Sequence, residues 1–411
     1  MPRHSPWFAR PAVLVLIFVS GLVLGWSGLL PNPISRQPAG VQREFVSFWQ
    51  AWRLVQEHYV DRSAVNTANM RDGAIRGMLG TLGDTDHTTY LTREEAERAA
   101  DDLAGHMEGI GVHISMRQGR PVVVAVVPDS PAQKAGVRPG DLLQQVDGTD
   151  LKDKSTTQIV QLVAGKAGTQ LNLAVSREGE PQPIALTITR ARIDVADVNW
   201  HMFPGRPVAY VFIRSFGEKV DEQLRQALAD AAQAGARGLV LDVRANAGGI
   251  KDQAVAVTSE FLKGGDVFIE RDSAGRQTAV PVEPGGTATD IPLVLLIDEG
   301  TASSAEIFAG AIQDHRRGKL VGTKTVGAGT VLQPYRLSDG SEVWLAIAEW
   351  LTPNGRRIWH EGIMPDVPVA LPAGATILLA DELGRLTAAE LAKSSDKQLL
   401  KALEVLDEQV K

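Results

Sequence analysis

The sequence predicts a multidomain protein of the α+β class, in which helical regions flank two domains of mixed structure. Apolar residues recur at helical spacing near the N-terminus, from Phe45 to Tyr59. Short β-runs separated by turns fill residues 105–192, and apolar strands alternate with helices through residues 193–378. A last helical region covers residues 379–411. Apolar strands that alternate with helices indicate a layered α/β core.

The N-terminal helical region spans residues 43–104. After the amphipathic helix from Phe45, a second helix runs through MRDGAIRGMLGTLG and ends before Asp84. Thr92 then precedes two acidic residues, Glu94 and Glu95. A threonine N-cap followed by acids in the first turn predicts a third helix.

The two domains that follow differ in their patterns. In residues 105–192, strands such as VVVAVV and DLLQQVDG alternate with turns, and TTQIVQLVA reads as a helix. In residues 193–378, the strand GLVLDVR ends in Ala-Asn-Ala-Gly-Gly, and the strand IPLVLLID precedes small residues that lead into a helix. In the C-terminal region, Thr387 and Glu390 form a predicted capping box.

The composition excludes several classes of function. The chain has 411 residues, a net charge of −7 and a pI near 5.7, so it lacks the basic field that holds nucleic acid. It has no cysteine, which excludes disulfides, thiolate metal sites and a thiol nucleophile. The eight histidines are scattered without a zinc-binding spacing. We therefore expect a chemistry that needs no metal and no organic cofactor.

The N-terminal stretch predicts a membrane anchor and a linker. Residues 12–30 carry no charge, follow Arg3 and Arg10, and as a helix would be about 28 Å long, close to the hydrocarbon thickness of a bilayer. The positive charges predict a cytoplasmic tail of residues 1–11 and a body on the extracytoplasmic, periplasmic side. A cleaved signal peptide is the alternative, and it too places the body beyond the membrane. Residues 31–42, rich in Pro, Gly and polar groups, are the predicted linker.

Five segments, in order and at domain-scale spacing, resemble the carboxyl-terminal processing (tail-specific) serine proteases. They are FWQAWRLVQEHYVD; GIGVHI with SPAQKAGVRPGDLLQQVDG; GLVLDVRANAGG; DEGTASSAEIFAGAIQDHRRGKLVGTKTVGAGTVLQ; and LTPNGRRIWHEGIMPDV. The resemblance implies a PDZ domain over residues 105–192, inserted beside a crotonase- or Clp-like serine protease core over residues 193–378. A PDZ domain binds a peptide's C-terminal end as an added strand. By resemblance, the loop that receives the carboxylate is Gly109, Ile110, Gly111 and Val112.

The resemblance places the nucleophile at Ser303, ahead of a helix. A hydroxyl there lies beside unpaired N–H groups and the positive end of the helix dipole, which stabilise an oxyanion. The alternative is an N-cap, which Thr301, Ser303 or Ser304 could each supply. By resemblance, the oxyanion donors are the backbone N–H groups of Gly248 and Ser304.

The departure from the family is at the general base. The family pattern T-[FV]-G-K-G reads Thr-Val-Gly-Ala-Gly here, so Ala328 occupies the position of the lysine. A serine without an adjacent base is a poor nucleophile near neutral pH. His315 and Lys324 are predicted to lie too far away to replace the lysine. The exchange looks like a deliberate inactivation, and natural loss of the base is the alternative.

Further residues carry over from the resemblance. Gln333 matches the glutamine that orients the lysine, but it lies five residues after position 328 instead of four. Asp314 and Arg317 are expected to be structural supports, as an ion pair. Arg177 resembles an arginine that couples peptide binding to the active site, and a surface arginine is the alternative.

The sequence therefore predicts an extracytoplasmic, membrane-anchored endoprotease that cuts polypeptides near their C-termini through a Ser/Lys dyad, here inactivated. The expected partners are polypeptide C-termini, the membrane through residues 12–30 and, by resemblance, a second copy in a homodimer. A natural pseudoprotease that only binds peptide ends is the second hypothesis. A crotonase-type acyl-CoA enzyme is a third, although a PDZ domain and a membrane anchor have no place there.

Overall fold

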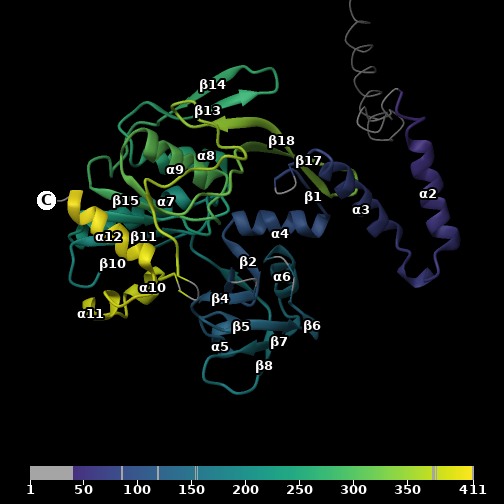
Figure 1. The fold of residues 1–411 in the computed structure, drawn as a ribbon, viewed down its shortest axis with the longest axis horizontal. Helices are drawn as coiled ribbons and strands as arrows, with labels where there is room; N and C mark the ends of the chain where they lie inside the picture. The colour runs from purple at the N-terminus through teal and green to yellow at the C-terminus, as the bar shows by residue number, and fades with distance from the viewer. Residues whose placement is uncertain are drawn as a thin grey trace, which may run out of the picture. The chain divides into compact units, whose positions relative to one another are not determined.

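The computed structural model describes residues 40–84, 87–117, 120–152, 154, 156–372, 375 and 377–409. The chain divides into two compact units, Met1–Ala74 and Ile75–Lys411. The predicted α+β class, with a PDZ-like domain beside a layered core, is confirmed (Figure 1).

The predicted membrane anchor is not supported, and the location derived from it is corrected. Residues 12–30, the predicted span, lie outside the described residues, as does the predicted tail of residues 1–11. Within the described ranges, no helix combines the length and the apolar character that crossing a bilayer requires. A single-pass membrane location is therefore withdrawn.

The first unit contains the helix predicted from Phe45. Helix α2 spans Phe45–His58, a 3₁₀ turn η2 spans Arg62–Ala64, and α3 (Thr67–Gly80) begins in this unit. The aromatic rings of α2 contact one another, as in Phe48 and Trp49 with ring centroids 5.0 Å apart. No residue of α2 is buried.

A six-stranded sheet forms the middle of the second unit. Its order is β10-β11-β12-β15-β16-β19, and within it only β10 runs antiparallel to its neighbour. The strands are β10 (Val198–Met202), β11 (Val208–Ile213), β12 (Gly238–Asp242), β15 (Leu293–Ile297), β16 (Lys319–Gly322) and β19 (Val367–Pro368). The loops after β12 and β15 carry Gly248 and Ser303, at the carboxyl ends of adjacent parallel strands.

Helices cover both faces of this sheet, which makes three layers (Figure 1). One face packs against α7 (Val220–Gln233), α8 (Lys251–Ser259) and α9 (Ser304–Asp314). The other packs against α10 (Ala380–Leu383), α11 (Ala388–Leu391) and α12 (Lys397–Gln409). Side chains alternate along a strand, so Val211 of β11 faces the first core and Tyr210 faces the second. A strand buried on both sides reads as a continuous apolar run, which is the pattern of the sequence.

A second, antiparallel sheet carries the strand that follows position 328. Strand β18 (Glu342–Leu351) pairs with β17 (Thr330–Arg336), with β1 (Thr89–Leu91) and with β13 (Asp266–Asp272), which also pairs with β14 (Gln277–Pro281). The register of β17 and β18 shifts between Val331 and Leu332. Position 328 is thus attached to a sheet, while Ser303 is attached to a helix.

The small domain is entered and left through a two-stranded ribbon. Helix α4 (Arg93–Leu103) precedes it, and β2 (His106–Gly109) pairs antiparallel with β9 (Ala191–Asp194). Its six-stranded sheet has the order β3-β4-β5-β7-β8, with β6 paired to β5. These elements are β3 (Val112–Arg117), β4 (Arg120–Val126), α5 (Pro131–Lys134), β5 (Leu142–Val146), β6 (Thr149–Asp150), α6 (Thr156–Val163), β7 (Gln170–Ser176) and β8 (Ile184–Thr189).

Candidate active site

Ser303 lies immediately before helix α9 in a strained backbone conformation. Its φ of 54° and ψ of −120° are sparsely populated for a residue with a Cβ, and such strain concentrates at functional sites. The Ser303 hydroxyl does not cap the helix, because the N–H of Glu306 donates to the Ser303 carbonyl at 2.8 Å instead. The residue is half-buried, so its side chain keeps contact with solvent.

The two neighbouring hydroxyl residues are occupied elsewhere. Thr301 Oγ1 donates to the Val243 carbonyl at 2.8 Å, and Ser304 Oγ donates to the Gly249 carbonyl at 2.9 Å. Within the described contacts, Ser303 is therefore the hydroxyl of this turn that is left for chemistry. Ser303 thus occupies the N-cap position of α9 without a cap hydrogen bond to its hydroxyl among the contacts of the described residues.

The glycine turn after β12 touches the Ser303 turn. Gly248 has a φ of +98°, and a Cβ placed on it would lie 2.7 Å from Ser303 Cβ and 2.9 Å from the Ser304 nitrogen. Asn246 ties the two turns together, because its carbonyl accepts from Ala302 N–H at 2.9 Å. Asn246 Oδ1 accepts the Gly248 N–H at 2.8 Å, so that predicted oxyanion donor is already engaged. Ser304 N–H is in the first helical turn, where backbone donors lack helical partners.

Position 328 lies beside the Ser303 turn, and one buried carboxylate connects them. Glu306 Oε2 accepts from the backbone nitrogens of both Ser303, at 2.9 Å, and Ala328, at 2.8 Å. These two nitrogens are therefore at most about 6 Å apart. Ala328 is half-buried, so a longer side chain has a route out of the backbone there.

Glu306 is a site residue that the sequence reasoning missed. Burial raises its pKa above the ordinary 4.5, and hydrogen bonds from Thr325, Gly327, Ser303 and Ala328 oppose that shift. The signal was present in the sequence as Ser-x-x-Glu before an apolar run, the pattern of a capping box.

Gln333 makes no hydrogen bond to Ser303 among the contacts of the described residues. It is exposed on β17, and its Nε2 donates to the adjacent Pro334 carbonyl at 3.3 Å. Leu332, four residues after position 328, is half-buried instead. The orienting role of Gln333 stays a prediction.

Asp314 and Arg317 support the structure, but they do not pair with each other as expected. Asp314 Oδ1 accepts from Arg356 Nε at 3.0 Å, and Asp314 Oδ2 accepts from the Asn354 N–H at 2.8 Å. Arg317 donates to three backbone carbonyls, those of Phe261, Ala288 and Ile291. The two side chains bond to different parts of the chain, because Asp314 reaches residues 354–356 while Arg317 reaches carbonyls before and after β13 and β14.

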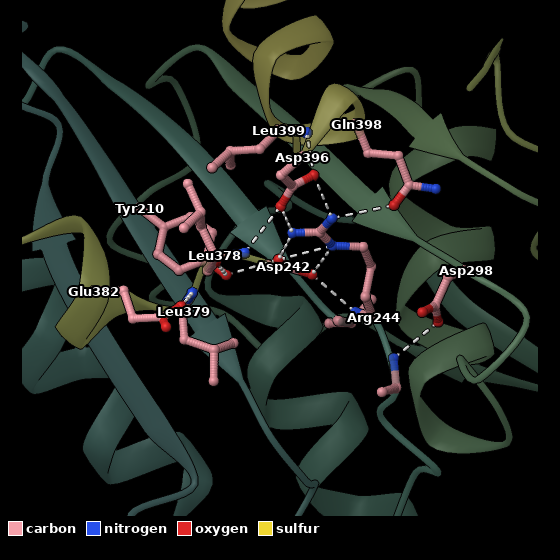
Figure 2. Close-up of polar contacts among 12 residues, drawn as sticks. Tyr210, Asp242, Arg244, Asp298, Leu378, Leu379, Glu382, Asp396, Gln398 and Leu399 are labelled. Carbon is pink, nitrogen blue, oxygen red and sulfur yellow. Dashed lines mark hydrogen bonds and ion pairs between the residues drawn. The ribbon is translucent and has the colours of Figure 1, made fainter. Parts of the chain in front are cut away.

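A buried charged network, which the sequence reasoning also missed, anchors the strand before the glycine turn (Figure 2). Arg244 follows β12 and has no solvent exposure. Its guanidinium binds Asp242, the last residue of β12, and Asp396 just before α12, with Nη1 to Asp396 Oδ1 at 2.9 Å. Tyr210 donates to Asp242 Oδ2 at 2.7 Å, and Gln398 Oε1 accepts from Arg244 at 3.1 Å.

His87 braces the strand that follows position 328. Its Nδ1 is hydrogen-bonded to Thr330 Oγ1, two residues after Ala328. Burial lowers the pKa of His87, and the nearby Asp84 opposes that shift. Asp84 in turn accepts from Thr88 N–H at 3.1 Å. No pattern in the sequence links this segment to the base position.

The small domain has an edge strand that contacts a helix. Strand β3 lies at the edge of its sheet and contacts α6. The loop before β3 is held by its carbonyls: Ile110 accepts from Ala132 N–H at 2.8 Å, and Gly111 accepts from Val127 N–H at 3.0 Å. Gly111 has a φ of +81°, and a Cβ on it would collide with Ser130. An open strand edge beside a helix is where a peptide strand can be added.

Two arginines hold the small domain together. Arg177 makes a two-point ion pair with buried Asp141, at 2.7 and 2.8 Å, and donates to the Gly136 carbonyl. Arg190 donates to the carbonyls of Leu162 and Val163, which end α6. The structure thus places Arg177 within its own domain, and its coupling role stays a prediction.

A strained serine turn packed against a glycine turn, on a layered core with a small β-rich domain inserted ahead of it, fits the class of PDZ-containing serine peptidases. Comparison with known proteins agrees: residues 207–369 match the Peptidase family S41 and residues 122–177 match a PDZ domain. The chain belongs to peptidase family S41, among the carboxy-terminal processing proteases.

Relatives and a solved structure resemble the chain over most of its length. The carboxy-terminal processing protease CtpA of Bacillus subtilis (strain 168) is 33% identical over 333 residues, which are 81% of this chain and 70% of that protein. The carboxy-terminal-processing protease of Bartonella bacilliformis is 30% identical over 365 residues, 87% of this chain and 83% of the relative. The structure of the photosystem II D1 C-terminal processing protease is 30% identical, with a TM-score of 0.54, and covers 80% of this chain and 95% of its own.

Proposed function

We propose that this chain is a C-terminal processing endoprotease whose catalytic base is missing, so that it captures polypeptide tails and cleaves them very slowly. The observation that carries the proposal is the shared Glu306 oxygen, which holds the backbone of Ser303 and of Ala328 side by side. A lysine at position 328 would start from that point with a flexible four-carbon stem. The nucleophile position is intact, and the position of its partner holds a methyl group.

The expected chemistry is acyl transfer to Ser303. With a lysine at position 328, its neutral amine accepts the proton of Ser303 Oγ while Oγ bonds to the peptide carbonyl carbon. The Ser304 N–H, at the N-terminus of α9, donates to the oxyanion that forms. The C–N bond then breaks as the amine leaving group takes the proton back from lysine, and water hydrolyses the acyl-enzyme. Without the base, we expect a loss of about 100-fold to 10,000-fold in rate.

Tail recognition falls to the PDZ domain. A polypeptide C-terminus would extend the sheet along β3, beside α6, with its carboxylate at the Gly109–Val112 loop. Main-chain hydrogen bonds then supply most of the affinity, so we expect little dependence on the tail's sequence. An amidated tail lacks the carboxylate and is the control ligand.

The test restores the base. Ala328→Lys should cleave an unfolded polypeptide with a free C-terminus at least about 100-fold faster than the chain as it stands. The same substitution combined with Ser303→Ala should remain inactive, and an amidated substrate should be cleaved more slowly. Cleavage by the double variant would show that Ser303 is not the nucleophile.

A natural pseudoprotease that binds peptide ends is the second candidate, and the alanine at position 328 favours it. The two candidates separate in the same experiment. If the Ala328→Lys protein binds free tails with the affinity of the parent chain yet cleaves nothing, the peptide-binding function stands and the protease function falls.

We also propose that two copies associate through helix α2. None of its residues is buried, and Trp49 and Leu54 are 54% and 57% exposed. Exposed apolar surface of this kind favours a protein contact. Sedimentation velocity should show a dimer that Trp49→Glu with Leu54→Glu converts to a monomer; a monomeric parent chain would refute the proposal.

A further inference from the structure

Among the helices that the structure describes, three start with the same Ser/Thr-x-x-Glu pattern, and the glutamate of one of them makes different contacts. In α4 and α11, the glutamate accepts the N-cap N–H at 2.8 Å and the threonine hydroxyl accepts the glutamate N–H at 3.3 Å. In α9, Glu306 accepts the Ser303 N–H at 2.9 Å, but its own N–H bonds to the Ser303 carbonyl. The bond from the Ser303 N–H to the Glu306 carboxylate is therefore formed, and the serine hydroxyl does not accept the Glu306 N–H.

Glu306 also differs from its two counterparts in what else it binds. Its side chain is buried, and Oε1 accepts from the Gly327 N–H at 2.7 Å and from the Thr325 hydroxyl. Oε2 accepts from the Ala328 N–H. The carboxylate thus binds three groups of the 325–328 loop in addition to the nucleophile residue.

All four partners of Glu306 are donors. Three are backbone N–H groups, and the Thr325 hydroxyl accepts from Ile363 N–H at 2.7 Å, which leaves its proton for Glu306. An ionised carboxylate only accepts hydrogen bonds and has about four lone-pair sites, whereas a protonated carboxyl group also carries a donor. The ionised form of Glu306 therefore matches its four donors. A glutamine would turn one oxygen into an NH₂ group that faces a donor, and one side of the contact would open.

We propose that Glu306 is a positioning residue, which holds the nucleophile turn and the 325–328 loop at a fixed separation so that a base at position 328 meets Ser303 Oγ. The proposal rests on the proposed function of Ser303 as nucleophile. Glu306 acts through the backbone of both residues and does not touch the substrate. Because catalysis depends steeply on the separation of nucleophile and base, loosening this contact costs rate more than substrate binding.

The kinetic test uses the Ala328→Lys protein as its parent. Adding Glu306→Gln should lower kcat on the order of 100-fold while KM stays within about twofold. The pH at which kcat/KM rises should also move down, because a nearby carboxylate raises the pKa of an amine and glutamine does not. The matched control is Glu390→Gln, which removes the same N3 carboxylate from the exposed start of α11 and should leave kcat, KM and the pH profile unchanged.

Full kcat in the Glu306→Gln protein, or an equal change in the Glu390→Gln control, would overturn the proposal. If Glu306→Gln fails to fold, Thr325→Val serves as the test variant. It removes the hydroxyl that donates to Glu306 Oε1 and keeps the side-chain volume nearly unchanged. A fall in kcat of about tenfold at unchanged KM supports the positioning role, and an unchanged kcat refutes it.

A second measurement tests whether Glu306 holds the 325–328 loop and does not depend on catalytic activity. In the chain as it stands, amide hydrogen exchange of residues 325–328 should accelerate at least about tenfold in Glu306→Gln, while a distant turn such as residues 272–276 keeps its rate. Unchanged exchange in the loop refutes the contact. If Ala328→Lys alone is inactive, the proposed function fails, and this exchange result still decides whether Glu306 holds the loop.

Discussion

Arg244 and Asp396 form an ion pair in which neither side chain is exposed to solvent, with Nη1 2.9 Å from Oδ1 (Figure 2). The pair joins the strand before the glycine turn to the first turn of α12, where Asp396 Oδ1 also accepts the Leu399 N–H at 3.0 Å. Asp242 and Asp396 share the one guanidinium, so each carboxylate depends on it. The C-terminal helix is thereby attached to the strand that presents Gly248.

Removing Asp396 should destabilise the core. Breaking a buried ion pair by deleting one partner costs about 3 to 5 kcal/mol, and we expect Asp396→Ala to lie near 3 because Asp242 still neutralises the arginine. Urea denaturation measures the change. Asp407→Ala, which removes an exposed pair with Arg206, is the control and should cost less than about 1 kcal/mol. Equal costs for the two variants would refute the role of the buried pair.

Arg177 should stabilise the PDZ domain through Asp141. Its loss leaves a buried carboxylate without its cation, so we expect Arg177→Ala to lower the stability of the domain by about 2 kcal/mol. Thermal unfolding and amide exchange of residues 136–146 measure it, with exposed Arg192→Ala as the control. If domain stability is unchanged but kcat falls on the Ala328→Lys background, Arg177 couples the domains instead.

Burial of His87 predicts that stability falls at acidic pH. Its pKa is lowered in the folded chain, so below the ordinary value of 6.5 the unfolded chain binds more protons than the folded one. The unfolding free energy therefore decreases as pH falls from the ordinary pKa toward the lowered one. Urea titrations across about pH 7 to 5 should show a shallower decrease in His87→Asn. Exposed His58→Asn is the control, and a slope unchanged by His87→Asn would contradict the prediction.

The sequence was sufficient for the order of elements and for the small-residue turn that precedes α9. Continuous apolar runs mark β12 and β15 because both faces of those strands are buried, and small residues before a helical run mark the start of α9. These signals are local, since each is read within about one element of chain. The choice of Ser303 within that run rests on the family resemblance, and its role as nucleophile stays a prediction.

The contacts that fix the site could not be predicted in the same way. Arg244 and Asp396 are 152 positions apart, and no periodicity connects them. Glu306 was readable as a helix cap, but the three donors from the 325–328 loop depend on how two loops meet in space. Gln333 is exposed on β17, and its orienting role stays a prediction.

Gly248 should be intolerant of a side chain for two separable reasons. Its φ of +98° disfavours a Cβ, and a Cβ would also meet Ser303 Cβ at 2.7 Å. Gly275 has a similar φ of +80° and nothing within 4 Å of the same position, so Gly275→Ala measures the backbone term alone. We expect Gly275→Ala to cost about 1 kcal/mol, and Gly248→Ala to cost more because backbone atoms must also move.

On the Ala328→Lys background, Gly248→Ala should lower kcat on the order of 100-fold, since it displaces the nucleophile turn, while Gly275→Ala leaves kcat unchanged. Equal stability losses and an unchanged kcat in Gly248→Ala would mean that the glycine turn does not set the position of Ser303.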